Sequence, residues 1–195
     1  MSKKFSWEEY NENKSEKPPN TLLVETLPYV NSRETALDFG AGALVDSKFL
    51  LEEGFGIVVA IDADPDSQKR ANEIDDDRFS FTQKAFEDAV IPPNSFDLIS
   101  AQNVAAFINQ SEFKTIISNL LNGLKNGGVI SINFFGDQDE WNTSDTTKNF
   151  VSKRQIQEMF DGLEIISFEE AEYDGNTALG TPKHWHTINV IAKKV

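Results

Sequence analysis

The stretch Thr35-Ala36-Leu37-Asp38-Phe39-Gly40-Ala41-Gly42-Ala43 decides the fold of this chain. Its short apolar run predicts a buried β-strand, and the two glycines that follow let the backbone turn tightly and approach a ligand. A helical pattern begins directly after it, so the free N–H groups of the helix start would face the same loop. A strand, a glycine loop and a helix in this order predict a cofactor cleft.

An acidic residue stands at the distance that such a cleft requires. The next apolar strand, Ile57–Asp62, ends in Asp62, twenty residues after Gly42. A carboxylate at this place can accept hydrogen bonds from the hydroxyls of a ribose. The sequence therefore predicts a cofactor that contains a nucleoside.

Two details separate the candidate cofactors. Dinucleotide sites favour a third glycine, and Val45 occupies that position. Asp38, just before the loop, would add negative charge beside a pyrophosphate, whereas it suits the sulfonium and ammonium groups of S-adenosylmethionine. The pattern favours a methyl donor. A nicotinamide-dependent oxidoreductase and a cofactor-binding protein without catalysis stay open as alternatives.

Outward from this stretch, short strand-like runs alternate with longer helical ones, which predicts an α/β fold with a parallel sheet. The expected strands are Thr35–Phe39, Ile57–Asp62, Phe79–Thr82, Phe96–Ala101 and Val129–Phe135. The expected helices are Val45–Glu53, Asp66–Ile74, Glu112–Leu124 and Lys153–Phe160, the third stopping at Lys125-Asn126-Gly127-Gly128. Two further runs, Leu163–Glu172 and Trp185–Lys193, predict an antiparallel hairpin at the sheet edge.

Composition narrows the classes of function. The 32 acidic and 18 basic residues give a net charge of −14, which argues against nucleic acid as a partner. The absence of Cys and the presence of only two His argue against a metal site. The first residues are polar and acidic, and no apolar run is long enough to span a membrane, so we expect a cytoplasmic protein. We divide the chain into an N-terminal arm and helix over 1–32 and one catalytic domain over 33–195.

Several motifs resemble, in order and spacing, those of the class I S-adenosylmethionine-dependent methyltransferases. Residues 37–42 are similar to the first motif of that family, 60–65 to its ribose-binding strand end, and 84–88 to the segment that lines the adenine. Residues 94–99 and 124–129 resemble its fourth strand and the turn before its fifth. The C-terminal part looks like small bacterial methyltransferases grouped with tellurite-resistance methyltransferases.

The resemblance implies one Rossmann-like, doubly wound domain, with a seven-stranded, mostly parallel sheet whose last strand is antiparallel and with helices on both faces. It implies S-adenosylmethionine as the cofactor and direct in-line transfer of its methyl group to a small-molecule acceptor. The predicted cofactor-binding residues are Asp38, Gly40, Ala41, Gly42, Asp62, Ala63, Ala85, Phe86 and Gln102. Phe86 is equally well explained as an ordinary core residue, and Gln102, which follows the fourth expected strand, is also explained by contact with the acceptor or by capping of a loop.

A general base is needed only if the acceptor is a hydroxyl or a protonated amine. His184 and His186 are two residues apart on an expected strand, so both side chains leave one face while Trp185 leaves the other. These two histidines and Asp137 are the candidate catalytic residues. A pair of histidines on an edge strand is, however, more often a solvated surface feature than a catalytic one. An acceptor attacked at a soft atom would need no base.

Two further hypotheses concern the surroundings of the cleft. An oxyanion acceptor would need a local basic patch on so acidic a protein, and Lys84, Arg154 and Lys183 could form one if the fold gathers them. Near the N-terminus, Trp7 and Tyr10 either belong to a lid over the cofactor or anchor an arm to the surface.

Overall fold

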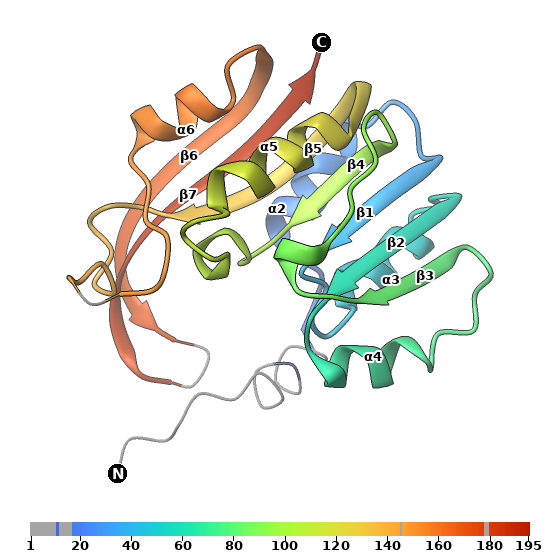
Figure 1. Cartoon of the computed structure of the whole chain (residues 1–195), viewed down its shortest axis with the longest axis horizontal. Helices are drawn as coiled ribbons and strands as arrows, with labels where there is room; N and C mark the ends of the chain where they lie inside the picture. The colour runs from blue at the N-terminus through green and yellow to red at the C-terminus, as the bar shows by residue number, and fades with distance from the viewer. Residues whose placement is uncertain (1–10, 12–16, 145, 178–179) are drawn as a thin grey trace.

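A computed structural model of the chain describes residues 11, 17–144, 146–177 and 180–195. Seven strands form one sheet in the order β3-β2-β1-β4-β5-β7-β6 (Figure 1). The strands are β1 Thr35–Phe39, β2 Ile57–Asp62, β3 Phe79–Gln83, β4 Phe96–Ala101, β5 Leu124–Phe135, β6 Leu163–Asn176 and β7 Pro182–Lys194. The helices are α2 Thr21–Thr26, α3 Val45–Glu52, α4 Pro65–Ala71, α5 Phe113–Gly123 and α6 Lys153–Met159, with 3-10 turns η1 Leu27–Tyr29, η2 Phe86–Asp88 and η3 Ala105–Phe107. Trp7 and Tyr10, for which a lid and a surface anchor were both left open, lie outside the described residues.

The pairing of the strands confirms the predicted fold class. Strands β1 to β5 pair in parallel, while β7 runs antiparallel to both β5 and β6. In Figure 1 the arrow of β7 accordingly points the opposite way from those of β1, β2 and β4. The strand order reverses between β1 and β4, which is where open α/β sheets bind their ligands.

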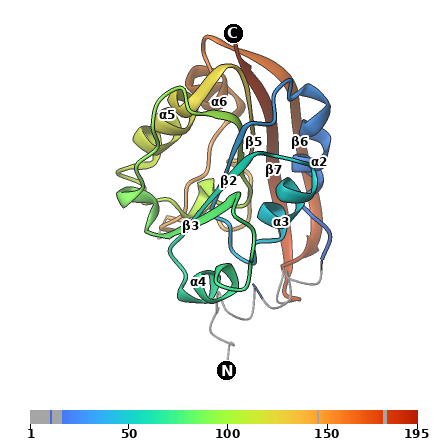
Figure 2. The same cartoon turned by 90° about the vertical axis from the view of Figure 1, so that its right-hand side faces the viewer.

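Helices cover both faces of the sheet, as predicted (Figure 2). On one face, α5 and α6 bury Ile117, Leu120 and Ile156 against β4, β5 and β7. On the other face, α2 and α3 bury Leu23 and Leu50 against the opposite side of the same sheet. Helix α2, which belongs to the segment 1–32 that was divided from the domain, is therefore packed into the core of the sheet domain.

The main difference from the expected boundaries lies before β5. The predicted helix over 112–124 ends at Gly123, and the Lys-Asn-Gly-Gly run that was expected to stop it is already part of β5. Leu124 is fully buried and pairs with Phe96 of β4, so tertiary pairing overrides the local turn signal. A side chain at position 123 would approach Ile91 to 2.7 Å, which explains why glycine ends the helix there.

The hairpin of β6 and β7 extends past the rest of the sheet. The pairing of β7 with β5 ends at Thr187, whereas its pairing with β6 continues to Pro182. Residues 182–186 therefore project beyond β5, supported by β6. None of the helices in the described part of the chain is long and apolar enough to cross a membrane.

Candidate active site

A cleft of about 890 Å³ opens at the carboxyl ends of the parallel strands, within the range of roughly 300–1,000 Å³ typical of small-molecule sites. Its walls come from the segments that follow β1 to β5 and from the projecting β6–β7 hairpin. Among the predicted cofactor residues, the cleft is lined by Gly40, Gly42, Asp62, Ala63, Ala85, Phe86 and Gln102. We call the side formed after β1 to β3 the glycine-loop half, and the side formed by Phe107, Phe135, Trp141 and Trp185 the aromatic half.

The glycine loop is shaped by one tight contact. Gly40 has a φ of +81°, and a Cβ placed on it would lie 2.2 Å from Cγ2 of Val104. The N–H groups of Gly40 and Ala41 both donate to the carbonyl of Ile61, at 2.8 and 3.1 Å. Only glycine fits both the backbone angle and the space, and the loop consequently presents bare backbone to the cleft.

Asp62 is the organising carboxylate of the glycine-loop half. One oxygen accepts the N–H of Gly42 at 2.8 Å and the other accepts the N–H of Asp64 at 2.8 Å. Burial raises the pKa of Asp62, while these two hydrogen bonds oppose the rise. Each oxygen keeps further lone pairs, so the side chain can also accept hydrogen bonds from hydroxyls of a ligand.

Asp38 lies beneath the loop and does not line the cleft. Its side chain is buried and accepts a 2.6 Å hydrogen bond from the hydroxyl of Ser47 in α3. Burial, followed by the charge of Asp46, raises the pKa of Asp38 to about 8. Ala41 is also buried and outside the lining. Asp38 therefore does not face the cleft directly, and its predicted role at the methionine end of the cofactor stays a prediction.

Sequence patterns did not single out Asn11, which reaches the cleft from the N-terminal segment. Its amide donates a 2.9 Å hydrogen bond to Asp64, and its Oδ1 lies 3.0 Å from where a Cβ of Gly42 would be. Asn11 is buried and lines the cleft between these two loops. A lone Asn in a polar segment carries no sequence signal of such a role.

Phe86 forms an aromatic surface near the glycine loop. Its ring centroid is 4.9 Å from that of Phe39, and its tip is 3.5 Å from the Cβ position of Gly40. The residue at position 39, a large Phe, thus supports the ring from below and is itself fully buried. Phe86 consequently offers a flat apolar face for a planar ring of a ligand.

Gln102, after β4, has one satisfied and one unsatisfied polar atom. Its Nε2 donates to Oγ of Ser131 at 2.7 Å and to the carbonyl of Ser131 at 3.0 Å. Its Oε1 is buried and has no partner among the described residues. A buried acceptor without a partner is uncommon in native proteins and points to a donor supplied by a ligand.

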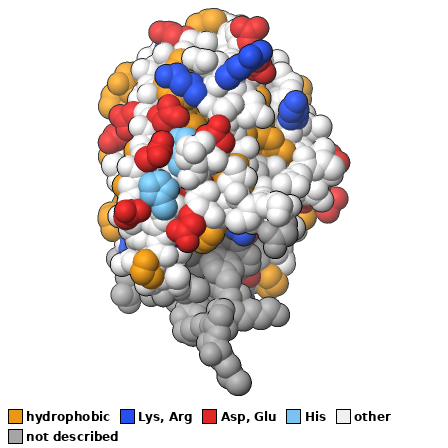
Figure 3. Space-filling model, turned by 90° about the vertical axis from the view of Figure 1, so that its left-hand side faces the viewer, with side chains coloured by type: hydrophobic (Ala, Val, Ile, Leu, Met, Phe, Trp, Pro, Cys, Tyr) orange, Lys and Arg blue, Asp and Glu red, His pale blue; other side chains and the backbone are white. Residues whose placement is uncertain are grey.

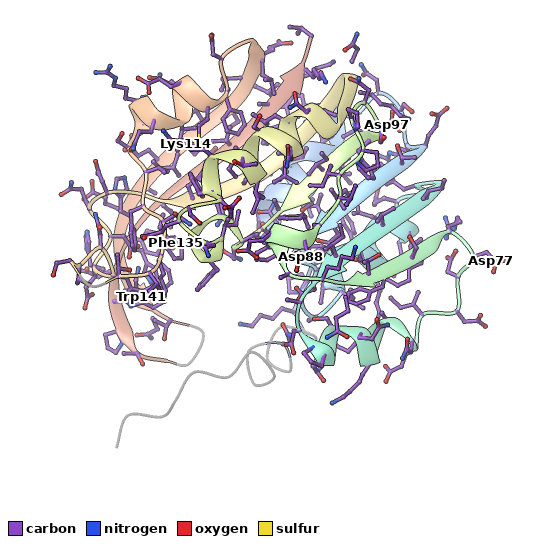
Figure 4. The ribbon with its side chains drawn as sticks, viewed as in Figure 1. Asp77, Asp88, Asp97, Lys114, Phe135 and Trp141 are labelled. Atoms are coloured by element: carbon purple, nitrogen blue, oxygen red, sulfur yellow. The ribbon has the colours of Figure 1, made fainter. Side chains whose placement is uncertain are left out.

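The aromatic half of the cleft is built around three rings that touch one another. We call Phe135, Trp141 and Trp185 the aromatic wall; their ring centroids are 5.5 to 5.8 Å apart. The rings come from the end of β5, the loop after it and the projecting part of β7. Figure 4 shows Phe135 and Trp141 close together, at the opposite end of the sheet from Asp97.

Behind the aromatic wall lies a buried ion pair. Nζ of Lys183 is 2.5 Å from Oδ2 of Asp139, and the two side chains are 1% and 0% exposed. The same ammonium lies 3.5 Å from the ring centroid of Trp185 and 4.5 Å from that of Trp141. Asp139 also accepts the N–H of Trp141 at 3.0 Å. Asp139 and Lys183 thereby connect the loop after β5 to the hairpin and orient both indoles.

The candidate catalytic residues do not line the cleft. His186 is buried against Gly136; its Nδ1 accepts the N–H of Gln138 at 3.0 Å, so its Nε2 donates to Glu170 at 3.1 Å. His184 is exposed on the same outer face, 2.8 Å from Asp174, which raises its pKa. Figure 3 shows histidine side chains among acidic ones on this face.

The alternation of this strand is as predicted, but the cleft lies on the side of Trp185. Asp137 is exposed, 3.7 Å from His186, and also lies outside the lining. The expectation that one of these three residues acts as a base therefore finds no support in the geometry. The described residues include no group of three His, Asp or Glu side chains arranged to hold a metal ion.

Comparisons with known proteins agree with this architecture. A family profile described as a methyltransferase domain matches residues 36–128. None of the curated proteins compared with the chain matches it in sequence.

Solved structures with the same fold include TehB from Haemophilus influenzae, which is 19% identical with a TM-score of 0.78, over 97% of this chain and 68% of that one. An S-adenosylmethionine dependent methyltransferase from Mesorhizobium loti is 15% identical with a TM-score of 0.67, over 88% of this chain and 95% of that one. The 1,6-didemethyltoxoflavin-N1-methyltransferase of Burkholderia thailandensis, solved with bound 1,6-didemethyltoxoflavin and S-adenosylhomocysteine, is 15% identical with a TM-score of 0.65, over 89% of this chain and 76% of that one.

At these identities the solved structures establish the fold. The family profile adds that residues 36–128 form a methyltransferase domain. Both findings agree with the resemblance to class I S-adenosylmethionine-dependent methyltransferases that the motifs of the sequence indicate.

Proposed function

We propose that this chain, which carries an S-adenosylmethionine-dependent methyltransferase domain, transfers the methyl group to a small-molecule acceptor bound against its aromatic half. The observation that carries the proposal is the division of one cleft into two unlike halves. One half offers bare backbone, a carboxylate and a flat ring, and the other offers a cluster of aromatic side chains.

The glycine-loop half fits the parts of the cofactor. Asp62 is positioned to accept hydrogen bonds from the ribose hydroxyls. Phe86 provides an apolar face for the adenine, and the unpartnered Oε1 of Gln102 is an acceptor for a donor group such as the ammonium. When bound, the cofactor supplies an electrophilic methyl group on a sulfonium. Burial and the charge of Asp46 raise the pKa of Asp38 to about 8, which favours the protonated carboxyl beneath the loop near neutral pH.

The aromatic half would hold the acceptor so that its nucleophilic atom faces the methyl group. Alignment of two reactants in one site can lower a barrier by roughly 7–11 kcal/mol. No histidine lines this cleft, so the proposal relies on positioning and on exclusion of water. The hairpin partly encloses the cleft, and the protein is strongly acidic. Both features favour a small molecule over a nucleic acid as the acceptor. A cytoplasmic location fits a chain without cysteine.

Isothermal titration calorimetry of the whole chain with S-adenosylmethionine and with S-adenosylhomocysteine tests the proposal. We expect saturable binding of both, and no binding of reduced nicotinamide dinucleotide. Transfer of a labelled methyl group to members of a small-molecule acceptor panel would then establish turnover. Binding of the nicotinamide cofactor alone would contradict the proposal and favour an oxidoreductase.

A further inference from the structure

The ionisable residues that line the cleft are of one sign. Asp62, Asp64, Glu87 and Glu140 line it, and no Lys, Arg or His belongs to its lining among the described residues. Glu140 lies on the aromatic half, where its Oε2 accepts the N–H of His184 at 2.7 Å. An anionic acceptor would therefore meet like charge without a basic partner from the part of the chain that the structure describes, and this repulsion adds to that of the whole protein.

Two lysine side chains in the described part of the chain lie close to the aromatic wall, but neither lines the cleft. The ammonium of Lys183 is buried behind the aromatic wall in its pair with Asp139. Lys148 lies 5.2 Å from the ring centroid of Trp141 and 5.6 Å from that of Phe107, but it lines a neighbouring cavity and not the cleft.

The two remaining candidates for a basic patch are also apart from the cleft. Lys84 is exposed and outside the lining. Arg154 pairs with Glu158 along α6 at 2.9 Å. The fold does not gather Lys84, Arg154 and Lys183 into a patch that faces a ligand.

The aromatic wall presents a large and rigid apolar surface. Trp141 and Trp185 are fixed by their contacts with each other, with Phe135 and with the buried ammonium of Lys183. Aromatic side chains fixed in this way prefer planar partners in offset or edge-on contact, worth about 0.5–1.5 kcal/mol beyond burial. The wall is therefore suited to a flat ring system and gives an inorganic oxyanion no hydrogen-bond donor from a charged side chain.

We propose that the acceptor is a planar aromatic or heteroaromatic molecule without negative charge, packed against Phe135, Trp141 and Trp185. This inference rests on the proposed function, because it names the acceptor class of the same cleft. The carbon–sulfur bond of the sulfonium breaks as the acceptor atom forms its bond to carbon, and the thioether keeps the electron pair. A neutral acceptor gains the positive charge that the sulfonium loses, and either keeps it or releases a proton to water.

Calorimetry on the chain saturated with S-adenosylhomocysteine tests the inference with four probes. The probes are 4-hydroxyquinoline, 4-aminoquinoline, quinoline-4-carboxylate and sodium selenite. We expect the first two to bind, the carboxylate to bind at least tenfold more weakly than 4-hydroxyquinoline, and selenite to give no binding heat. This series uses the unaltered protein and therefore does not depend on the folding of a variant.

A substitution then tests the place of binding. Trp185→Ala should weaken 4-hydroxyquinoline at least tenfold and leave the affinity for S-adenosylhomocysteine within twofold. The matched control is Tyr29→Ala, which removes an exposed aromatic residue of η1 outside the cleft and should change neither affinity. If Trp185→Ala fails to bind S-adenosylhomocysteine, Trp141→Phe replaces it, with the smaller ring expected to weaken 4-hydroxyquinoline measurably.

Two results would overturn the inference while the proposed function stands. One is binding of selenite or of the carboxylate as tight as that of 4-hydroxyquinoline. The other is binding of S-adenosylhomocysteine without binding of either of the first two quinolines. Failure of S-adenosylhomocysteine itself to bind would refute the proposed function, and the inference with it.

Discussion

The two halves of the cleft differ in how the chain builds them. The glycine-loop half comes from short segments that directly follow β1, β2 and β3, and its shape depends on backbone angles and N–H groups. The aromatic half combines the end of β5, the loop after it and β7, and its shape depends on side chains that pack around one ion pair. The glycine-loop half is thus local and governed by the backbone, whereas the aromatic half depends on tertiary structure and on side chains.

The largest effect should come from breaking the ion pair of the aromatic half. Lys183→Met leaves the carboxylate of Asp139 buried without its partner, which should lower the free energy of unfolding by about 3–5 kcal/mol. Urea denaturation measures this loss. The double variant Lys183→Met/Asp139→Asn should recover part of it, because no unpaired charge remains. A loss below about 1 kcal/mol in the single variant would show that the pair does not hold this half together.

The next effect should be confined to the glycine-loop half. Asp62→Asn removes a charged acceptor from the proposed ribose site, and a hydrogen bond to a charged group contributes about 1.5–3 kcal/mol. We expect the affinity for S-adenosylhomocysteine, measured by calorimetry, to fall roughly 10- to 100-fold. Asp66→Asn, four residues further on and outside the lining, is the matched control. If the two variants bound S-adenosylhomocysteine equally well, Asp62 would not contribute to binding of the cofactor.

A smaller effect should appear in how the stability of the protein changes with pH. Because the folded pKa of Asp38 is about 8 and an unfolded Asp has a pKa of about 3.9, the folded state holds an extra proton between these values. The contribution of this carboxyl to the free energy of unfolding is therefore fully present below about pH 4, and it is lost as the pH rises towards 8.

Asp38→Asn should remove this dependence. Denaturation at pH 5 and pH 8 should show the original chain losing at least about 1.4 kcal/mol more than the variant, the equivalent of one pKa unit. If the free energies of unfolding of the two chains changed equally between pH 5 and pH 8, Asp38 would be ionised in the folded protein.

The smallest effect should come from the outer face of β7. His184→Ala alters an exposed side chain that lies outside the cleft. We expect the affinities for S-adenosylhomocysteine and for 4-hydroxyquinoline to stay within twofold. If either affinity fell more than tenfold, His184 would have to contribute to ligand binding, and the contrast between the two faces of this strand would be weaker.

Much of the fold and of the glycine-loop half could be predicted because the signals are local. The apolar run, the two glycines and Asp62 lie within thirty residues, and backbone geometry relates them directly. What local signals could not show is burial in three dimensions. They indicated Asp38 as a carboxylate near the methionine end of the cofactor, and the structure adds that it is buried beneath the loop against Ser47.

The aromatic half could not be predicted in the same way. Alternation along residues 184–186 correctly separated the histidines from Trp185, but alternation alone does not say which face meets the cleft. The pairing of Lys183 with Asp139 joins residues 44 positions apart, and only the register of the hairpin brings them together. The start of β5 was missed for a similar reason, since Leu124 is held by its neighbour Phe96 in the sheet.

The projecting end of the hairpin has a consequence for how such a protein can diversify. Residues 182–186 extend about 17 Å at the rise of a β-strand, and they carry Pro182 and Trp185 into the cleft wall without contributing to pairing with β5. The length of the loop that joins β6 to β7 changes stability only slowly, by about 0.6 kcal/mol per doubling, whereas residues 182–186 include Lys183, whose pair with Asp139 has to be kept. Changes of that loop that keep the pair can therefore reshape the wall of the aromatic half and leave the glycine-loop half unchanged.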